Sequence, residues 1–153
     1  MSPGSPFRFR LERIRALRER REELAREELA KANVRLTGSQ ARLRTIDAHL
    51  ERIRAEQRNA TSESASVPAE ELRDRQAFAE HIESQRRDGA SEVAHREADV
   101  ATRSDELGRA AREHEMLERL KERKRAEHTR EQGRREILAL DDLAIDRFRR
   151  SVA

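Results

Sequence analysis

The chain has 153 residues, of which 34 are Lys or Arg and 31 are Asp or Glu, so that 42% of it is charged while the net charge is only +3. Leu, Ile, Val and Phe account for 29 residues, too few for a compact globular core of this length. Ala, Glu, Lys, Leu and Arg account for 93 residues, and this richness in helix formers is typical of a long helix or coiled coil.

The chain lacks cysteine, which excludes a disulfide framework and a thiolate zinc site. Its longest purely apolar run, residues 137–140, is far shorter than the roughly 20 residues that a membrane span needs. Residues 1–6 contain Pro3, Gly4 and Pro6 but no apolar leader segment, and we expect them to form a short tail without regular structure. These features predict a cytoplasmic protein.

A first helix is predicted over residues 7–60. Its apolar stripe begins with Phe7, Leu11 and Ile14 at helical spacing. Further along, two interleaved series with a spacing of seven residues indicate the seam of a coiled coil. These series are Leu29, Leu36, Leu43 and Leu50, and Ala32, Ser39, Ile46 and Ile53.

A loop is predicted over residues 61–67, which are rich in Ser and Thr, and Pro68 is predicted to open a second helix over residues 68–149. Glu70 and Glu71 follow where the positive end of a helix favours acids. The second helix also carries two heptad series. They are Leu72, Ala79, Arg86, Val93, Val100 and Leu107, and Ile82, Gly89, Arg96, Arg103, Ala110 and Leu117.

Two apolar stripes joined by a short polar loop predict an all-α fold, namely a long antiparallel two-helix coiled coil, or helical hairpin, with the second helix longer. In the register that we expect, the numbers of facing residues add to about 128. This register places Ile46 opposite Ile82, and it places Gly38 and Ser39 opposite Gly89, where small residues on both helices allow a close approach.

The same register predicts that the second helix has no partner within the chain from about Glu122 onward. Exposed apolar clusters of this kind usually mark an interaction surface. Docking on another protein is one interpretation, and pairing with a second copy or folding back locally is the other. The apolar residues of this extension are Ile137, Leu138, Leu140, Leu143, Ile145 and Phe148.

The sequence gives no sign of catalysis, of a cofactor or of a bound metal. Its five histidines form neither an H-E-x-x-H motif nor a pair four residues apart, and its five glycines are too scattered for a phosphate-binding loop. We therefore expect a protein that is not an enzyme and that needs no cofactor.

Basic residues are concentrated at 7–21, with seven Arg against two Glu, and at 117–135, with eight Lys or Arg against four Glu. The hairpin brings these segments side by side. Three interpretations stay open: binding of nucleic acid, binding of an acidic protein, and a merely solvated charged face. The absence of Tyr and Trp speaks against stacking on bases.

Phe78 precedes the seam residue Ala79 and lies one turn before Ile82. This places two large apolar groups at one edge of a polar helix. They either cap the seam or form a small docking patch. The residues at the same height on the first helix are Ile46, His49 and Ile53.

Three sequence runs resemble the FliJ family of flagellar export proteins. The opening FRFRLERIRALRERREELAREELAKA matches the Phe-rich, Leu-rich stripe with which the family opens, although Arg15 replaces an expected Leu. The second run comprises Leu117, Leu120, Lys121, Glu122 and Arg123. The third comprises Leu140, Asp141, Asp142, Leu143 and Ala144, and the resemblance extends over nearly the whole chain from Phe7.

The resemblance implies a fold similar to the coiled coil of the rotary ATP synthase gamma subunit and a role in type III protein export. It implies insertion into the hexameric ring of the export ATPase FliI, a link to the export gate protein FlhA and handling of export chaperones, at the cytoplasmic face of the inner membrane. The end with both termini would then engage the ring. Its residues would be Arg10, Arg13, Lys121, Arg125, Ile137, Leu140, Leu143 and Phe148.

The resemblance also implies that the patch around Phe78 contacts the gate. That patch consists of Phe78 and Ile82 on the second helix and Ile46, His49 and Ile53 on the first. The alternatives are a self-associating coiled-coil scaffold and, less in keeping with the composition, a basic helical arm that binds RNA. We expect no nucleic acid, membrane insertion or small molecule among the ligands.

Overall fold

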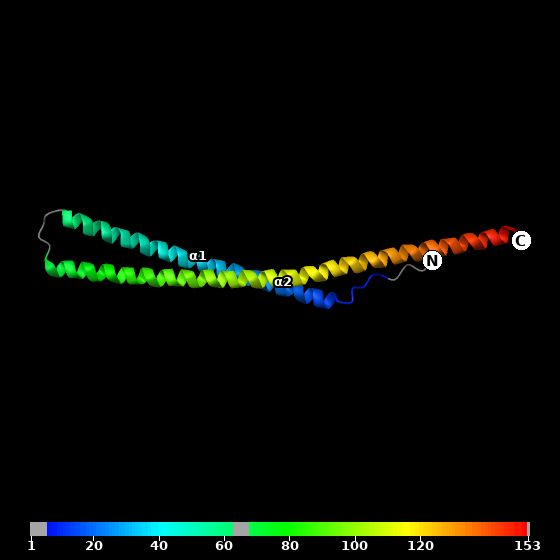
Figure 1. Ribbon diagram of the computed structural model, residues 1–153, viewed down its shortest axis with the longest axis horizontal. Helices are drawn as coiled ribbons and strands as arrows, with labels where there is room; N and C mark the ends of the chain where they lie inside the picture. The colour runs from blue at the N-terminus through cyan, green and yellow to red at the C-terminus, as the bar shows by residue number, and fades with distance from the viewer. Residues whose placement is uncertain (1–5, 63–67, 153) are drawn as a thin grey trace. The chain divides into compact units, whose positions relative to one another are not determined.

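The structure, a computed structural model, describes residues 6–62 and 68–152, which form two helices and no strand (Figure 1). Helix α1 spans Glu12–Ser62, with 51 residues, and α2 spans Ala69–Val152, with 84. The all-α prediction, with two helices that pack on each other and the second longer, is confirmed. Residues 1–5 and 63–67 lie outside the described residues, and so does most of the predicted tail and loop.

The ends of the helices follow from their local sequence. Pro68 directly precedes α2, and its carbonyl accepts a hydrogen bond from the Leu72 N–H at 3.2 Å. Glu70 and Glu71 lie in the first turn of α2, and Arg149 and Arg150 lie in the last, so both sets of charges complement the helix dipole. Helix α1 begins at Glu12 and not at the predicted Phe7, and residues 6–11 before it are not helical.

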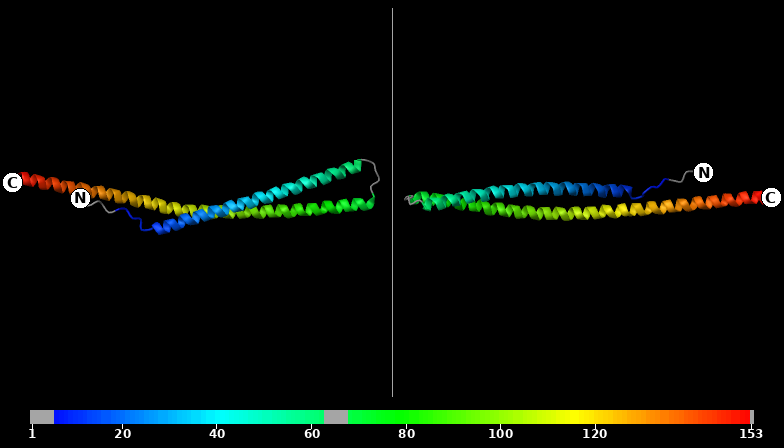
Figure 2. Two further views of the ribbon diagram at one scale, coloured as in Figure 1. Left: turned by 180° about the vertical axis from the view of Figure 1, so that it is seen from behind. Right: turned by 90° about the horizontal axis from the view of Figure 1, so that it is seen from above.

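Contacts divide the chain into two units, each of which contains part of both helices. Unit 1 combines the residues up to Glu23 with those from Arg109 onward, and unit 2 spans Leu24–Gly108. The helices run antiparallel within each unit (Figure 2), because contacting residues fall along α2 as they rise along α1. In unit 1 these contacts include Lys121 with Glu12 and Glu118 with Arg15, and in unit 2 they include Arg86 with Asp47 and Glu83 with Arg54.

The helix seam is thin. All eight residues of the heptads predicted for α1 are buried or half-buried, and in α2 only Leu72 and Arg86 of the twelve are exposed. The core cluster of unit 2 consists of Leu50, Ile53, Ala79 and Ile82, with Ile46 packed against it. Arg96 and Arg103 occupy seam positions in α2 and are half-buried, which keeps the apolar stripe narrow.

The register differs from the predicted one by about one helical turn. The contacting pairs Arg15 with Glu118 and Asp47 with Arg86 have numbers that add to 133, not to about 128. Gly89 therefore faces Leu43 and Ile46 instead of Gly38 and Ser39. The predicted layer of small residues is thus wrong, because the small size of Gly89 makes room for two long side chains of α1.

The register makes opposite predictions for two helical glycines. A Cβ at Gly38 would meet nothing within 4 Å, whereas a Cβ at Gly89 would lie 3.3 Å from Leu43 Cδ1. Replacing a mid-helix Gly by Ala stabilises a helix by about 0.5–1 kcal/mol when space allows. We expect Gly38→Ala to give this gain in the free energy of unfolding, measured in urea. Gly89→Ala should gain clearly less, and equal gains would contradict the observed register.

Both helices in the described chain are long, but neither has an apolar stretch that would suffice to cross a membrane.

Candidate functional site

The residues that sequence reasoning assigned to the patch around Phe78 divide into core and surface. Ile82 and Ile53 are only 5% and 8% exposed and belong to the core of unit 2, and Ile46 packs against that core. Phe78 is 49% exposed because it lies one position before the buried Ala79 on α2. The surface that a partner can reach is therefore Phe78 and its neighbour on α1, while the three isoleucines support it from beneath.

The neighbour of Phe78 on α1 is His49. The two ring centroids are 5.9 Å apart and the planes meet at 70°, an edge-to-face arrangement. His49 is half-buried between the seam and solvent. The contact holds one edge of the Phe78 ring while its other side stays open to a partner.

A second candidate surface begins with residues 6–11, which we call the N-terminal strap. The strap is not helical, and the exposure of its side chains alternates. Phe7, Phe9 and Leu11 are half-buried, whereas Arg8 and Arg10 are exposed. This alternation indicates a segment with one face on a surface, and the strap ends in a turn in which the Glu12 N–H donates to the Phe9 carbonyl at 3.2 Å. The surface is α2, since the ring centroids of Phe7 and His128 are 5.7 Å apart.

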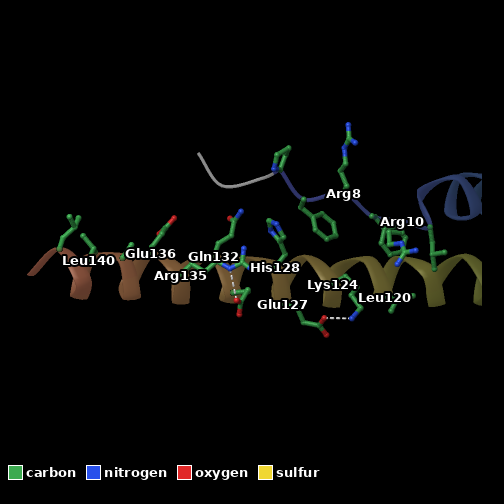
Figure 3. A pocket seen from close by; sticks show the side chains of 17 residues that line it. Arg8, Arg10, Leu120, Lys124, Glu127, His128, Gln132, Arg135, Glu136 and Leu140 are labelled. Carbon is green, nitrogen blue, oxygen red and sulfur yellow. Dashed lines mark hydrogen bonds and ion pairs between the residues drawn. The ribbon is translucent and has the colours of Figure 1, made fainter. Parts of the chain in front are cut away.

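The strap and α2 enclose an apolar groove of about 1300 Å³ (Figure 3). Phe7 and Phe9 contribute from the strap, and α2 lines the groove from Leu120 to Leu143. Two charged pairs on α2 neutralise part of the wall, Lys124 with Glu127 and Arg135 with Glu131. The basic side chains that remain beside the groove come from the strap, namely Arg8 and Arg10.

The basic residues predicted for this end of the chain do not all behave alike. Arg10, Arg13 and Arg125 are exposed and take part in no ion pair among the described residues. Lys121 is half-buried and pairs with Glu12 at 3.0 Å, so it joins α2 to α1. Three of the four are thus available to an acidic partner, and Lys121 contributes to the helix pairing.

The C-terminal part of α2 carries the apolar side chains that the sequence placed there. Every residue from 134 to 151 is exposed. We call residues 134–151 the C-terminal tail. The sequence predicts that the unpaired region begins near Glu122. Among the described residues, the last ion pair between the two helices joins Lys121 to Glu12, and beyond it the strap contacts α2 at His128. The exposed fractions are 60% for Ile137 and Leu140, 54% for Leu143 and 70% for Phe148.

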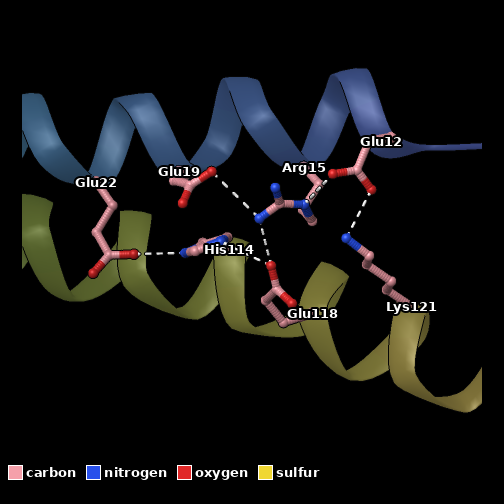
Figure 4. Close-up of polar contacts among 7 residues, drawn as sticks. All are labelled: Glu12, Arg15, Glu19, Glu22, His114, Glu118 and Lys121. Atoms are coloured by element: carbon pink, nitrogen blue, oxygen red, sulfur yellow. Dashed lines mark hydrogen bonds and ion pairs between the residues drawn. The ribbon is translucent and has the colours of Figure 1, made fainter. Parts of the chain in front are cut away.

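Charged residues join the two helices of unit 1 (Figure 4). The guanidinium of Arg15 donates to Glu12 at 2.8 Å and to Glu118 at 2.5 Å. The Nδ1 of His114 lies 2.8 Å from the Glu22 carboxylate. The Arg15 hydrogen bond lowers the pKa of Glu118, and Lys121 followed by Arg15 lowers the pKa of Glu12.

These directions predict how unit 1 responds to acid. A carboxyl group whose pKa is lower in the folded chain adds stability above its ordinary pKa near 4.5, and this stability is lost as the pH falls through the lowered value. Glu118→Gln should therefore lower the unfolding temperature at pH 7 and flatten its dependence on pH below about 5. The matched control is Glu122→Gln, at an exposed residue that makes no ion pair with any other described residue. Identical acid profiles for both variants would contradict the role of Glu118.

No group of three or more His, Asp or Glu side chains able to hold a metal ion occurs among residues 6–62 and 68–152. The model of the flagellar FliJ protein family matches residues 7–153. The chain belongs to the flagellar FliJ family. No significant match was found among curated proteins or among solved structures.

Membership of the FliJ family makes the chain a component of the flagellar protein export apparatus. The match begins at Phe7 and so includes all of the strap except Pro6, and the contact of the strap with α2 was not predicted from the sequence. A signal for it was present. The alternation Phe7, Arg8, Phe9, Arg10, Leu11 has the period of an extended segment, but Phe7, Leu11 and Ile14 also fit a helix.

Proposed function

We propose that this FliJ-family chain is a non-enzymatic link between the export ATPase ring and the export gate, at the cytoplasmic face of the membrane. Family membership supports a place in the export apparatus. The observation that supports the link is that both units expose apolar side chains, Phe78 in unit 2 and those of the C-terminal tail in unit 1. A linker needs two binding surfaces, and the export chaperones are further candidates for either.

The surface for the ATPase lies in unit 1. The C-terminal tail exposes apolar side chains to solvent. Full burial of one such side chain against a partner stabilises the complex by roughly 1.5–3 kcal/mol. Arg10, Arg13 and Arg125 add exposed positive charge in the same unit. Apolar burial supplies the affinity, whereas the arginines orient the approach and make the association sensitive to salt.

The surface for the gate lies in unit 2. Phe78 offers a half-exposed ring on a charged helix, and aromatic side chains of this kind are frequent anchors of protein interfaces. His49 holds the ring from one side. Ile46, Ile53 and Ile82 keep α1 and α2 together beneath it.

Purified ATPase and the cytoplasmic part of the gate protein test the link. The wild-type chain should bind the ATPase alone and the gate protein alone. On beads that carry the gate protein, it should also retain the ATPase. Phe78→Ala should weaken gate binding at least about tenfold, the loss of a typical interface anchor. It should leave ATPase binding and the unfolding temperature nearly unchanged, because the ring is half-exposed.

The matched control is Leu72→Ala, which also truncates a half-exposed apolar residue of α2, 48% exposed. Leu72 does not belong to the patch, so gate binding should persist in this variant. Unchanged gate binding by Phe78→Ala, or equal losses in both variants, would contradict the assignment of the gate surface.

A further inference from the structure

Charge changes sign along the last part of α2. Residues 123–135 contain six Lys or Arg and two Glu, a net charge of +4. Residues 136–146 contain one Glu and three Asp but no Lys or Arg, a net charge of −4. The two blocks have nearly the same length and equal, opposite charge. When two copies of this segment lie antiparallel, the basic block of each therefore faces the acidic block of the other.

The acidic block takes part in no ion pair among residues 6–62 and 68–152. Asp141, Asp142 and Asp146 are exposed, and none of them takes part in an ion pair among the described residues. The basic block is only partly neutralised, because Lys124 and Arg135 pair with neighbouring glutamates. Charge is therefore left over on both blocks in the isolated chain.

The apolar groups lie in the same stretch of helix. The groove of unit 1 follows α2 from Leu120 to Leu143, so it overlaps both charge blocks. The C-terminal tail exposes Ile137, Leu140 and Phe148 by 60–70%. One segment thus holds a groove, an exposed apolar ridge and two complementary charge blocks.

We propose that the free chain forms an antiparallel dimer in which the C-terminal tail of each copy lies along the groove and basic block of the other. An isologous interface uses the same patch twice, and the reversed charge order along α2 satisfies this condition. A parallel pair would place basic on basic and acidic on acidic, at a cost in free energy. The exposed Arg8 and Arg10 of the strap add positive charge at the groove that receives the aspartates.

The dimer and the ATPase complex use the same tail and exclude each other. The dimer does not depend on the proposed link to the ATPase, since it follows from the charge order and the exposed apolar groups alone. In the dimer, the tail is covered until a stronger partner replaces the second copy.

Sedimentation velocity over a concentration series tests the dimer. The wild-type chain should approach twice its mass of 17.8 kDa at about 100 µM, where an interaction with a micromolar Kd is nearly saturated. The triple variant Asp141→Arg, Asp142→Arg, Asp146→Arg should be monomeric, and so should Arg130→Asp, Arg134→Asp, Arg135→Asp. An equimolar mixture of the two variants should dimerise again, because each supplies the charge that the other lacks.

The control Asp74→Arg, Glu97→Arg, Asp105→Arg makes the same change of charge at exposed residues of unit 2 and should still dimerise. Because the chain has no cysteine, single cysteines report the orientation. Ile137→Cys, near the middle of the pairing, should form a disulfide between copies, and Arg149→Cys should not. Three results would each overturn the proposal: a monomeric wild-type chain at about 100 µM, no dimer in the mixture, or cross-linking through Arg149→Cys. A monomeric wild-type chain would mean that a different protein occupies the groove.

Discussion

Deletion of residues 136–153 should strongly weaken binding to the export ATPase and leave the helix pairing intact. The described residues of this segment are all exposed, so their removal takes little from the core. The lost burial of several apolar side chains should weaken ATPase binding by a factor on the order of 100 or more. Binding to the immobilised ATPase and thermal unfolding followed by circular dichroism measure the two effects.

A full-length variant controls for the shortened helix. Replacement of Ile137, Leu140, Leu143 and Phe148 by Gln keeps the length and the charge of α2 and should reproduce most of the loss. A salt series should weaken the remaining binding further if Arg10, Arg13 and Arg125 act through charge. Full-strength binding by the truncated chain would refute the role of the tail.

Leu50→Ala should be the most destabilising single substitution in unit 2. Leu50 is 2% exposed and packs in the core cluster. Truncating a buried Leu to Ala typically costs about 2–5 kcal/mol, and a two-helix core that relaxes easily favours the lower half of this range. Urea unfolding measures the loss. Leu72→Ala removes the same atoms from a residue 48% exposed and should cost less than about 1 kcal/mol. Similar costs for the two variants would contradict the position of the core.

The heptads predicted the seam because a spacing of seven residues tests the same helix face many times. The eight residues of their series on α1 are all buried or half-buried. The heptads could not determine which residues of the two helices face each other, because a repeating seam is compatible with several alignments. The match of Gly38 and Ser39 with Gly89 favoured one alignment, but in the structure the side chains of Leu43 and Ile46 lie beside Gly89.

Part of each candidate surface could be predicted from the sequence. Spacing placed Phe78 beside the seam, but it could not separate the exposed Phe78 from the buried Ile82, because one helical position decides which side of the seam a residue faces. The apolar residues of the tail were identified from the sequence, and its first residue depended on the register. The strap was not predicted, because the five residues 7–11 that carry its alternation fit both the extended and the helical period.

The thinness of the core has a consequence for cooperativity. Among the described residues, five apolar side chains are buried, and four of them form one cluster in unit 2. Hydrogen bonds within a helix connect each residue only to its own neighbours, so a segment far from the cluster can open without disturbing it. Amide hydrogen exchange should therefore be slowest around Leu50 and Ile82 and should become gradually faster with distance from them, because the helix pair frays from its ends.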